Sequence, residues 1–402
     1  MRNVAVSLRQ CQVYVVATVD TDQRGLLRCQ RFHNTDCCYG IVGTETRAPH
    51  RVAIVGAGSI GRRHAALLAA SPRTMVAAVV DPDPRAEAVA DANGAPWLAD
   101  LDRLLDRDRP DAAIIATPNA LHREQAERCI ARGIPVLVEK PIATSVEDGE
   151  RIADAAERRG VPVLVGHHRR HSSFLAAAQR LVGDNALGQV VAVSATTIFA
   201  KPSEYFAAAP WRREPGGGPV LINLIHDVDA LRALAGEVAE VHAIASGVVR
   251  GLVVEDSAAV ILRFVGGAIG TMLLSDVAAS PLSWESTSGE DPIYPRYTDR
   301  DCYVVAGTHG TLGVPTMRLT TSDGDPSWHR TMVSTTIRVE PADPLQRQLD
   351  HFCDVIDGAA TPASSARDAV ESLRVTLAIA EAASTGRAVA CAPSGAMAKP
   401  SS

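Results

Sequence analysis

The chain has 402 residues, of which 46% are hydrophobic, and a formal net charge of −6 at pH 7. This length indicates two or three domains, and the hydrophobic content is enough to fill sizeable cores. A mildly acidic chain has no electrostatic attraction to phosphate backbones or anionic lipid, so we expect neither nucleic acid nor a membrane as a partner. No stretch approaches the roughly 20 apolar residues that a membrane helix needs.

Residues 1–49 show no sustained hydrophobic period, and we expect a poorly ordered extension, or upstream sequence included by a misplaced start. Four of the eight cysteines and one histidine cluster there. Their spacing matches no zinc pattern, so no metal is expected, although a metal site is the alternative. These residues are Cys11, Cys29, His33, Cys37 and Cys38. The remaining cysteines are scattered singly, as in a reducing cytoplasm, and we predict a cytoplasmic protein.

From Arg51 onward, short apolar runs alternate with helical patterns. Strands are expected at 51–55, 75–80, 112–116, 135–138 and 161–165, and helices at 60–70, 85–92, 102–105, 117–132 and 146–159. This alternation predicts βαβ units, in which a parallel sheet carries helices on both faces. We therefore predict an α/β Rossmann domain at residues 50–168.

After Gly166 the strands follow one another instead of alternating with helices. Strands are expected at 190–199, 238–249, 258–265, 268–275, 302–306, 316–319 and 333–339, and helices at 174–182, 221–234, 346–356 and 366–383. Such runs predict an α+β domain with a large, mostly antiparallel sheet and helices on one face. This domain is expected at 169–390, and the Ala-, Pro- and Ser-rich residues 391–402 are expected to form a flexible tail.

The glycine-rich turn Gly56-x-Gly58-x-x-Gly61 lies between the first strand and the first helix. In that context it predicts a dinucleotide site, because Gly56 permits a tight turn, Gly58 lets a pyrophosphate approach and Gly61 lets helix and strand pack closely. The phosphates would meet free N–H groups at the start of the helix. Ser59, Ile60 and Arg62 complete the set of residues expected to contact the cofactor here.

Asp81 ends the second strand, about 20 residues after the last glycine, as the dinucleotide fingerprint requires. Its carboxylate can accept the ribose hydroxyls of adenosine and would repel a 2′-phosphate, which favours NAD over NADP. An aspartate that only caps the following turn is the alternative. Arg62, Arg63 and Arg85 could neutralise a phosphate and so support NADP.

Glu139-Lys140-Pro141 follows the fourth strand, at the sheet edge where open α/β sheets bind ligands. Lys140 there can exchange a proton with a substrate hydroxyl as hydride leaves the carbon, since partial burial lowers the pKa of a lysine toward neutrality. A surface lysine at a strand end is the alternative. The Lys-Pro bond also has a baseline chance of being cis, about 5%.

Several motifs together resemble the Gfo/Idh/MocA family of oxidoreductases, over residues of about 50 to 390. They are the glycine-rich turn, Ala116-Thr117-Pro118-Asn119 followed by His122, Glu139-Lys140-Pro141, and Gly216-Gly217-Gly218 followed by His226. The resemblance implies a bound nicotinamide cofactor and substrates with oxidisable hydroxyls, commonly sugars or cyclitols. It also implies that the open sheet of the second domain forms subunit interfaces, hence a homodimer or homotetramer.

The resemblance assigns roles to individual residues. Lys140 resembles the catalytic lysine of the family, and His226 resembles its second-domain acid/base histidine. Groups around the nicotinamide and its ribose are implied at Thr117, Pro118, Asn119, His122 and Glu139. The family often has an aspartate four residues before the histidine, where this chain has Ile222. Since residues three or four apart are neighbours on a helix, Asn223 or Asp229 could orient the His226 ring instead.

Candidate substrate contacts come from three other segments. Gly166-His167-His168-Arg169-Arg170-His171 follows the last Rossmann strand, and His168 and Arg169 could bind a substrate carboxylate or phosphate; a solvated basic loop is the alternative. Lys201, Tyr205, Trp211 and Arg212 precede the glycine run and suit a sugar pocket. Residues 284–297 show no period and are expected to cover the site or to reach a neighbouring subunit.

These features predict an NAD-dependent dehydrogenase that transfers a hydride between a hydroxyl-bearing carbon of a sugar, cyclitol or related compound and nicotinamide. Two alternatives stay open. One is an NAD-using glycosidase-type enzyme with transient redox, and the other is a non-catalytic sensor of dinucleotide or sugar.

Overall fold

The computed structural model describes residues 3–5, 16–18, 48–107 and 109–391. The chain forms two compact units, Met1–Ala48 and Pro49–Ser402. In the first unit, β1 (Asn3–Ala5) and β2 (Val16–Thr18) pair antiparallel. The cysteine–histidine cluster and residues 392–402 lie outside the described residues.

The second unit begins with a six-stranded sheet in which every pair of neighbouring strands is parallel. The order is β5-β4-β3-β6-β7-β8. The strands are β3 (His50–Val55), β4 (Thr74–Val80), β5 (Trp97–Leu98), β6 (Ala112–Ile115), β7 (Val136–Val138) and β8 (Val163–Val165). The predicted Rossmann sheet is confirmed, and β5 is the strand that the sequence pattern missed because it has only two residues.

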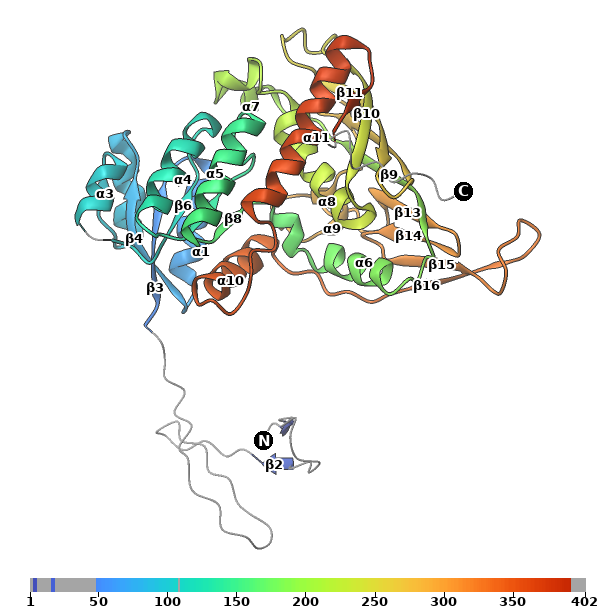
Figure 1. Ribbon diagram of the computed structural model, residues 1–402, viewed down its shortest axis with the longest axis horizontal. Helices are drawn as coiled ribbons and strands as arrows, with labels where there is room; N and C mark the ends of the chain where they lie inside the picture. Colours follow the sequence, from blue (N-terminus) through green and yellow to red (C-terminus); the bar gives the residue numbers. More distant parts are fainter. Residues whose placement is uncertain (1–2, 6–15, 19–47, 108, 392–402) are drawn as a thin grey trace, which may run out of the picture. The chain divides into compact units, whose positions relative to one another are not determined.

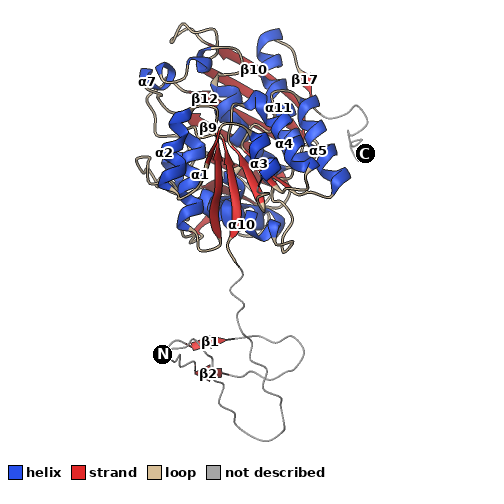
Figure 2. Cartoon of the chain, turned by 90° about the vertical axis from the view of Figure 1, so that its left-hand side faces the viewer, coloured by secondary structure: helices blue, strands red, loops and turns tan. Residues whose placement is uncertain are grey.

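Successive strand residues point to opposite sides of this sheet, and consecutive residues are buried, so both faces need a cover. Helices provide it on both faces (Figures 1 and 2). The helices are α1 (Ser59–Ala70), α2 (Glu87–Ala92), α3 (Leu101–Arg107), α4 (His122–Ala131) and α5 (Val146–Arg159). Short 3₁₀ turns, η1 (Pro84–Ala86) and η2 (Asn119–Leu121), precede α2 and α4. α5 starts at Ser145, whose side chain accepts from the N–H of Asp148, and ends at Gly160 in the left-handed conformation (φ +63°).

The nine-stranded sheet that follows has the order β16-β15-β14-β13-β9-β12-β11-β10-β17. All neighbouring pairs are antiparallel except β12 and β9, so the predicted mostly antiparallel sheet is confirmed. The strands are β9 (Val190–Ile198), β10 (Val238–Ser246), β11 (Ser257–Phe264), β12 (Ile269–Ser275), β13 (Tyr303–Gly307), β14 (Gly310–Val314), β15 (Arg318–Ser322), β16 (Met332–Thr336) and β17 (Val389–Ala390).

Helices and short helical turns complete this part of the chain. The α-helices are α6 (Ser173–Gly183), α7 (Ser203–Ala207), α8 (Ile225–Ala235), α9 (Trp284–Ser288), α10 (Pro344–Ile356) and α11 (Ala366–Thr385). The 3₁₀ turns η3 (His168–His171) and η4 (Pro210–Arg213) and the π-helical turn η5 (Val220–Leu224) connect them. No helix among the described residues is long and apolar enough to cross a membrane.

Helix α11 joins the two layers, and Figure 1 shows it in red between the sheets. Val370 and Leu373 at its start belong to the core of the parallel sheet, whereas Val375 and Ile379 belong to the core of the nine-stranded sheet. Phe352 of α10 also packs into the core of the parallel sheet. The carboxyl edge of the parallel sheet is thereby held next to α8, which places the two halves of the candidate site together.

Candidate functional site

The glycine-rich turn has the geometry that a bound pyrophosphate requires. Gly56 has φ +98°, and a Cβ there would lie 2.7 Å from the main chain of Ala116. A Cβ on Gly61 would lie 1.9 Å from the oxygen of Gly56, whereas a Cβ on Gly58 would meet nothing within 4 Å. Gly58 is the N-cap of α1 and offers no side chain as a cap, and the first turn of the helix has no acidic residue, so its first N–H groups remain available for an anion.

Asp81 braces this turn with both of its carboxylate oxygens. One oxygen accepts from the N–H of Ala57 at 2.7 Å, and the other accepts from the N–H of Asp83 at 2.9 Å. The carboxylate therefore caps the turn, as in the alternative interpretation, and it also places a negative charge directly beside the glycine-rich turn.

The three arginines that could support a 2′-phosphate all have partners. Arg85 pairs with Asp83 through Nε at 2.8 Å, and Arg62 donates from Nε to the oxygen of Ala57 at 3.1 Å. Arg63 donates to Asp291 at 2.7 Å. The last contact ties α1 to the segment 284–297, which contains the short helix α9 instead of being irregular throughout.

The loop after β6 lies against the glycine-rich turn and presents Thr117, Pro118 and Asn119. Pro118 is exposed, and the hydroxyl of Thr117 donates to Gln125 at 2.6 Å. His122 is fully buried, and each ring nitrogen lies 2.9 Å from a main-chain oxygen, one of Thr117 and one of Pro141. The ring of His122 thus joins the loop after β6 to the loop after β7, and its contact with the cofactor stays a prediction.

Glu139 is buried, and its carboxylate lies 2.7 Å from Nε2 of His64 on α1. Burial alone would raise the pKa of Glu139, but the hydrogen bond and charge of His64 lower it. The same carboxylate packs against Gly166, where a Cβ would lie 2.9 Å away. Glu139 thus holds the strand ends of β7 and β8 to α1, and its place near the nicotinamide stays a prediction.

Lys140 projects from the end of β7 and reaches the second half of the site. Its Nζ donates to the main-chain oxygen of Ile222 at 2.8 Å, and no carboxylate within the described residues forms an ion pair with it. Burial lowers the pKa of Lys140. The peptide bond to Pro141 is cis.

The π-helical turn η5 leads from the glycine run into α8 and carries the groups that meet the lysines. Glu255 anchors it by accepting from the N–H of Val220 at 2.8 Å. A Cβ on Gly218 would lie 2.3 Å from that carboxylate, so a larger residue there would displace Glu255 from this contact. Next to Ile222, Asn223 accepts from Nζ of Lys201 at 2.6 Å. Such π-turns occur frequently at functional sites.

His226 is buried among other imidazoles. Its ring meets that of His168 edge-on at 4.7 Å between centroids and that of His167 at 6.2 Å. Burial, and after it the charge of Lys140, lowers the pKa of His226 well below its usual range, so the ring is neutral. Its Nδ1 is buried and has no hydrogen-bond partner among the described residues.

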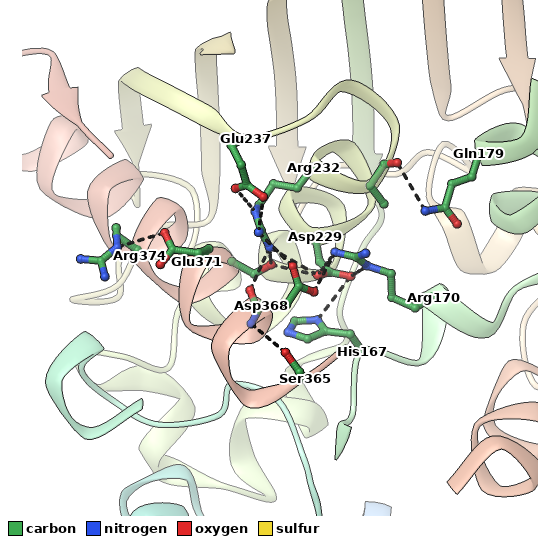
Figure 3. Close-up of polar contacts among 12 residues, drawn as sticks. His167, Arg170, Gln179, Asp229, Arg232, Glu237, Ser365, Asp368, Glu371 and Arg374 are labelled. Atoms are coloured by element: carbon green, nitrogen blue, oxygen red, sulfur yellow. Dashed lines mark hydrogen bonds and ion pairs between the residues drawn. The ribbon is translucent and has the colours of Figure 1, made fainter. Parts of the chain in front are cut away.

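Neither residue predicted to orient His226 does so. The carboxylate of Asp229 is held by Arg170 at 2.7 and 2.9 Å and by the hydroxyl of Ser372 at 2.9 Å, in the network shown in Figure 3. The side chain of Asn223 is occupied by Lys201. The predicted orienting contacts are wrong because both side chains bond residues of other elements and not the imidazole.

The basic segment after β8 has one side chain beside His226 and another in the protein interior. His168 lies beside His226, and burial lowers its pKa to about 4. Arg169 is buried and donates to Asp227 at 2.6 Å, to Glu285 at 2.7 Å and to the Tyr303 hydroxyl at 2.7 Å. The charge of Arg169 is thus balanced inside the protein, and its substrate contact stays a prediction.

In the segment before the glycine run, positively charged side chains pack against aromatic rings. Nζ of Lys201 lies 4.8 Å from the ring centroid of Tyr205, and the Arg212 guanidinium carbon lies 3.8 Å from it. Trp211 beside them is 50% exposed. Sequence reasoning missed Asp276, which follows β12 and lies 3.2 Å from Lys201. Its position directly after a strand was the available signal.

A family model described as "Oxidoreductase family, NAD-binding Rossmann fold" matches residues 50–167, and a model of the GFO/IDH/MocA C-terminal domain matches residues 175–313. The 1,5-anhydro-D-fructose reductase of Ensifer adhaerens is 27% identical over 84% of this chain and 98% of the relative. The inositol 2-dehydrogenase of Arthrobacter sp. is 34% identical over 46% of this chain, but over only 54% of its own length.

Solved structures agree with the fold. The WlbA dehydrogenase of Bordetella pertussis, determined with NADH and UDP-GlcNAcA, superposes with a TM-score of 0.69 at 26% identity, over 86% of this chain and 99% of that one. The aldose-aldose oxidoreductase of Caulobacter crescentus, complexed with glycerol, gives 0.68 at 25% identity, over 85% of this chain and 99% of that one.

Proposed function

Because the chain belongs to the Gfo/Idh/MocA family of NAD-binding oxidoreductases, we propose that it transfers a hydride between a hydroxyl-bearing carbon of a sugar, cyclitol or related polyol and a nicotinamide dinucleotide. The observation that carries this proposal is the contact of Lys140 with the turn that leads to His226. It brings two proton-carrying side chains, one from each layer, to the carboxyl edge of the parallel sheet. Ligands bind at that edge in open α/β sheets.

The cofactor would lie across the glycine-rich turn, with its pyrophosphate at the uncapped start of α1. Gly58 leaves space for this approach, and Ser59, Ile60 and Gly61 would supply main-chain N–H groups. The bound dinucleotide supplies the hydride acceptor or donor. Thr117, Pro118 and Asn119, at the end of β6, would border its nicotinamide half.

We assign NAD as the preferred cofactor and NADP as the weaker one. Asp81 places a carboxylate beside the glycine-rich turn, where it opposes a 2′-phosphate. The nearby arginines already bond other groups and are not free to bind that phosphate. They are Arg62, Arg63 and Arg85.

Lys140 manages the proton of the reacting hydroxyl. In the oxidation direction its neutral amine accepts this proton as the C–H bond gives up a hydride, and in the reduction direction its ammonium returns the proton to the carbonyl oxygen. Burial favours the neutral amine, because it lowers the pKa. His226, held neutral, lines the same space and shares the hydrogen bond to the substrate oxygen.

The open face of the nine-stranded sheet is assigned to subunit contact, as a homodimer or homotetramer. Large apolar side chains are exposed on it, which is unusual for a surface in water. They are Ile244 (77% exposed), Ile261 (53%), Ile269 (57%), Leu273 (48%) and Val304 (37%).

The test is a nicotinamide absorbance assay over a panel of polyols and sugars with NAD and NADP. We expect turnover of at least one polyol with NAD, and its loss in Lys140→Ala. Tight NAD binding without turnover of any member would contradict the proposal. A cofactor that copurifies, never exchanges and accompanies cleavage of a glycoside would replace it with the transient-redox alternative.

A further inference from the structure

The guanidinium of Arg212 is held in place but not neutralised. It lies 3.8 Å from the Tyr205 ring centroid and donates from Nη1 to the main-chain oxygen of Tyr205 at 2.6 Å. Nε is buried without an acceptor among the described residues, and Nη2 has no partner there either. A buried N–H without an acceptor costs free energy, so a ligand oxygen that reached this edge of Arg212 would supply a hydrogen bond that the described residues do not make.

Two cations near Arg212 share a single carboxylate among the described residues. Lys201 lies 4.8 Å from the same Tyr205 ring, and its only ion-pair partner among the described residues, Asp276, is shared with Arg250 at 3.0 Å. Burial lowers the pKa of Lys201 to about 8, and the charge of Lys140 adds to that effect. The Arg212 side of the site therefore carries positive charge that no ion pair among the described residues neutralises.

The neighbouring carboxylates are engaged elsewhere. Glu139 bonds His64, and Asp227 and Glu285 both bond Arg169. Glu255 is turned to the N–H of Val220. None of them forms an ion pair with Arg212 or Lys140 within the described part of the chain. An anion that enters this space would meet the guanidinium of Arg212, which has no ion-pair partner among the described residues, and the ammonium of Lys201, whose partner Asp276 also pairs with Arg250.

Arg212 and the proton-transfer pair belong to one continuous structure. A Cβ on Gly217 would lie 2.6 Å from Cα of Arg212, so the glycine run packs directly on this residue. The same run continues into η5. There the main-chain oxygen of Ile222 accepts a hydrogen bond from Lys140, and the side chain of Asn223 accepts one from Lys201. A ligand that contacts Arg212 and Lys201 thus extends toward Lys140.

We propose that the substrate polyol carries an anionic group, a carboxylate or a phosphate, which Arg212 binds while Lys201 contributes the second positive charge. This inference rests on the proposed function of the site, and it narrows the substrate class from sugars and cyclitols in general to sugar acids or sugar phosphates.

The experiment compares matched pairs of polyols on the NADH-bound protein by calorimetry, and on the NAD-bound protein by turnover. The pairs are galactose with galacturonate, glucose with gluconate, and glucose with glucose 6-phosphate, so that the carboxylate and phosphate arms are read separately. Each pair is measured on the unaltered chain, on Arg212→Met, on Arg212→Lys and on the matched control Arg213→Met. Arg213 lies in the same 3₁₀ turn, is exposed and has no side-chain partner among the described residues.

We expect the anionic member of at least one pair to bind at least about tenfold more tightly than the neutral one. Arg212→Met should abolish that preference, Arg212→Lys should restore part of it, and Arg213→Met should keep it. NADH affinity should be unchanged in all variants, which shows that they fold. Equal use of neutral and anionic members, or a preference that survives Arg212→Met, would overturn the inference while leaving the proposed function intact. Anion binding that depends on Arg212 without hydride transfer to any polyol would instead contradict the proposed function alone.

Discussion

The Nζ atom of Lys140 lies 2.8 Å from the main-chain oxygen of Ile222, four residues before His226. The lysine therefore meets a carbonyl dipole here and not a full negative charge. Because a carboxylate would stabilise the ammonium far more than a carbonyl does, this arrangement favours the neutral amine. It agrees with the direction in which burial shifts the pKa of Lys140.

The glycines of the turn should respond differently to the same added methyl group. Gly61→Ala should lower the free energy of unfolding by about 1–3 kcal/mol or more, because its Cβ would lie 1.9 Å from the oxygen of Gly56. Gly58→Ala should leave stability unchanged but weaken NAD binding, since its Cβ occupies open space in front of α1. Urea unfolding without cofactor and NADH titration measure the two effects. Equal loss of stability in both variants would contradict the roles given to these glycines.

The choice between NAD and NADP should depend on the acidic turn after β4. Asp83→Ala releases Arg85, and Asp81→Ala removes the carboxylate beside the glycine-rich turn. We expect each change to lower the ratio of kcat/KM for NAD over NADP, and the double variant to lower it about tenfold or more. Steady-state kinetics with both cofactors checks this. A ratio that stays constant in the double variant would show that the turn does not select the cofactor.

The network around Asp229 should act on stability and not on catalysis. Burial alone would raise the pKa of Asp229, but His167 and the hydrogen bond from Arg170 lower it to about 2, from a usual value of 3.8. The unfolded chain therefore binds more protons between these values, so the stabilisation of about 2 kcal/mol is complete above pH 4 and is lost as pH falls through 2. Melting temperatures measured between pH 2 and pH 7 should follow this course.

The corresponding variant separates the two roles. Asp229→Asn should lower the free energy of unfolding at pH 7 by about 3 kcal/mol, because it leaves Arg170 buried beside a neutral side chain. Asp154→Asn, which breaks the exposed pair with Arg367, is the matched control and should hardly change stability. If Asp229→Asn instead shifted the pH profile of kcat at a temperature where it is folded, Asp229 would orient His226 after all.

Assembly should depend on the open face of the nine-stranded sheet. Ile261→Asp together with Leu273→Asp should convert the oligomer to monomers in light scattering, since both side chains are exposed on that face and would bury charge on association. Val248→Asp is the control, because this residue is 85% exposed in the loop between β10 and β11. A dimer or tetramer that survives the double change would move the interface elsewhere.

Much of the parallel layer could be predicted from the sequence, because its signals are local. The glycine-rich turn, the strand before it and the lysine after β7 each lie within a few consecutive residues. The short strands β5 and β17 were missed, since two residues carry no measurable period. The start of α4 was predicted early, because the 3₁₀ turn η2 precedes it.

The partners within the site could not be predicted in the same way. Helical spacing places Asp229 near His226. It cannot show that the Asp229 carboxylate bonds Arg170, 59 residues earlier, instead of the imidazole of His226. Arg169 was expected to face substrate, yet Asp227, Glu285 and Tyr303 from three other segments enclose it. Such pairings are set by tertiary packing, which the local pattern does not contain.

The proton-transfer role of Lys140 is tested by the kinetics of Lys140→Met in the polyol assay, with NADH affinity measured alongside. We predict that kcat falls by about 10²–10⁴, while the dissociation constant for NADH changes less than about threefold, because the side chain handles a proton and does not hold the cofactor. In the unaltered chain, kcat/KM for oxidation should rise with pH and level off below pH 10.5, as the amine with its lowered pKa loses its proton. A Lys140→Met protein that keeps its activity within tenfold would contradict the proton-transfer role of Lys140.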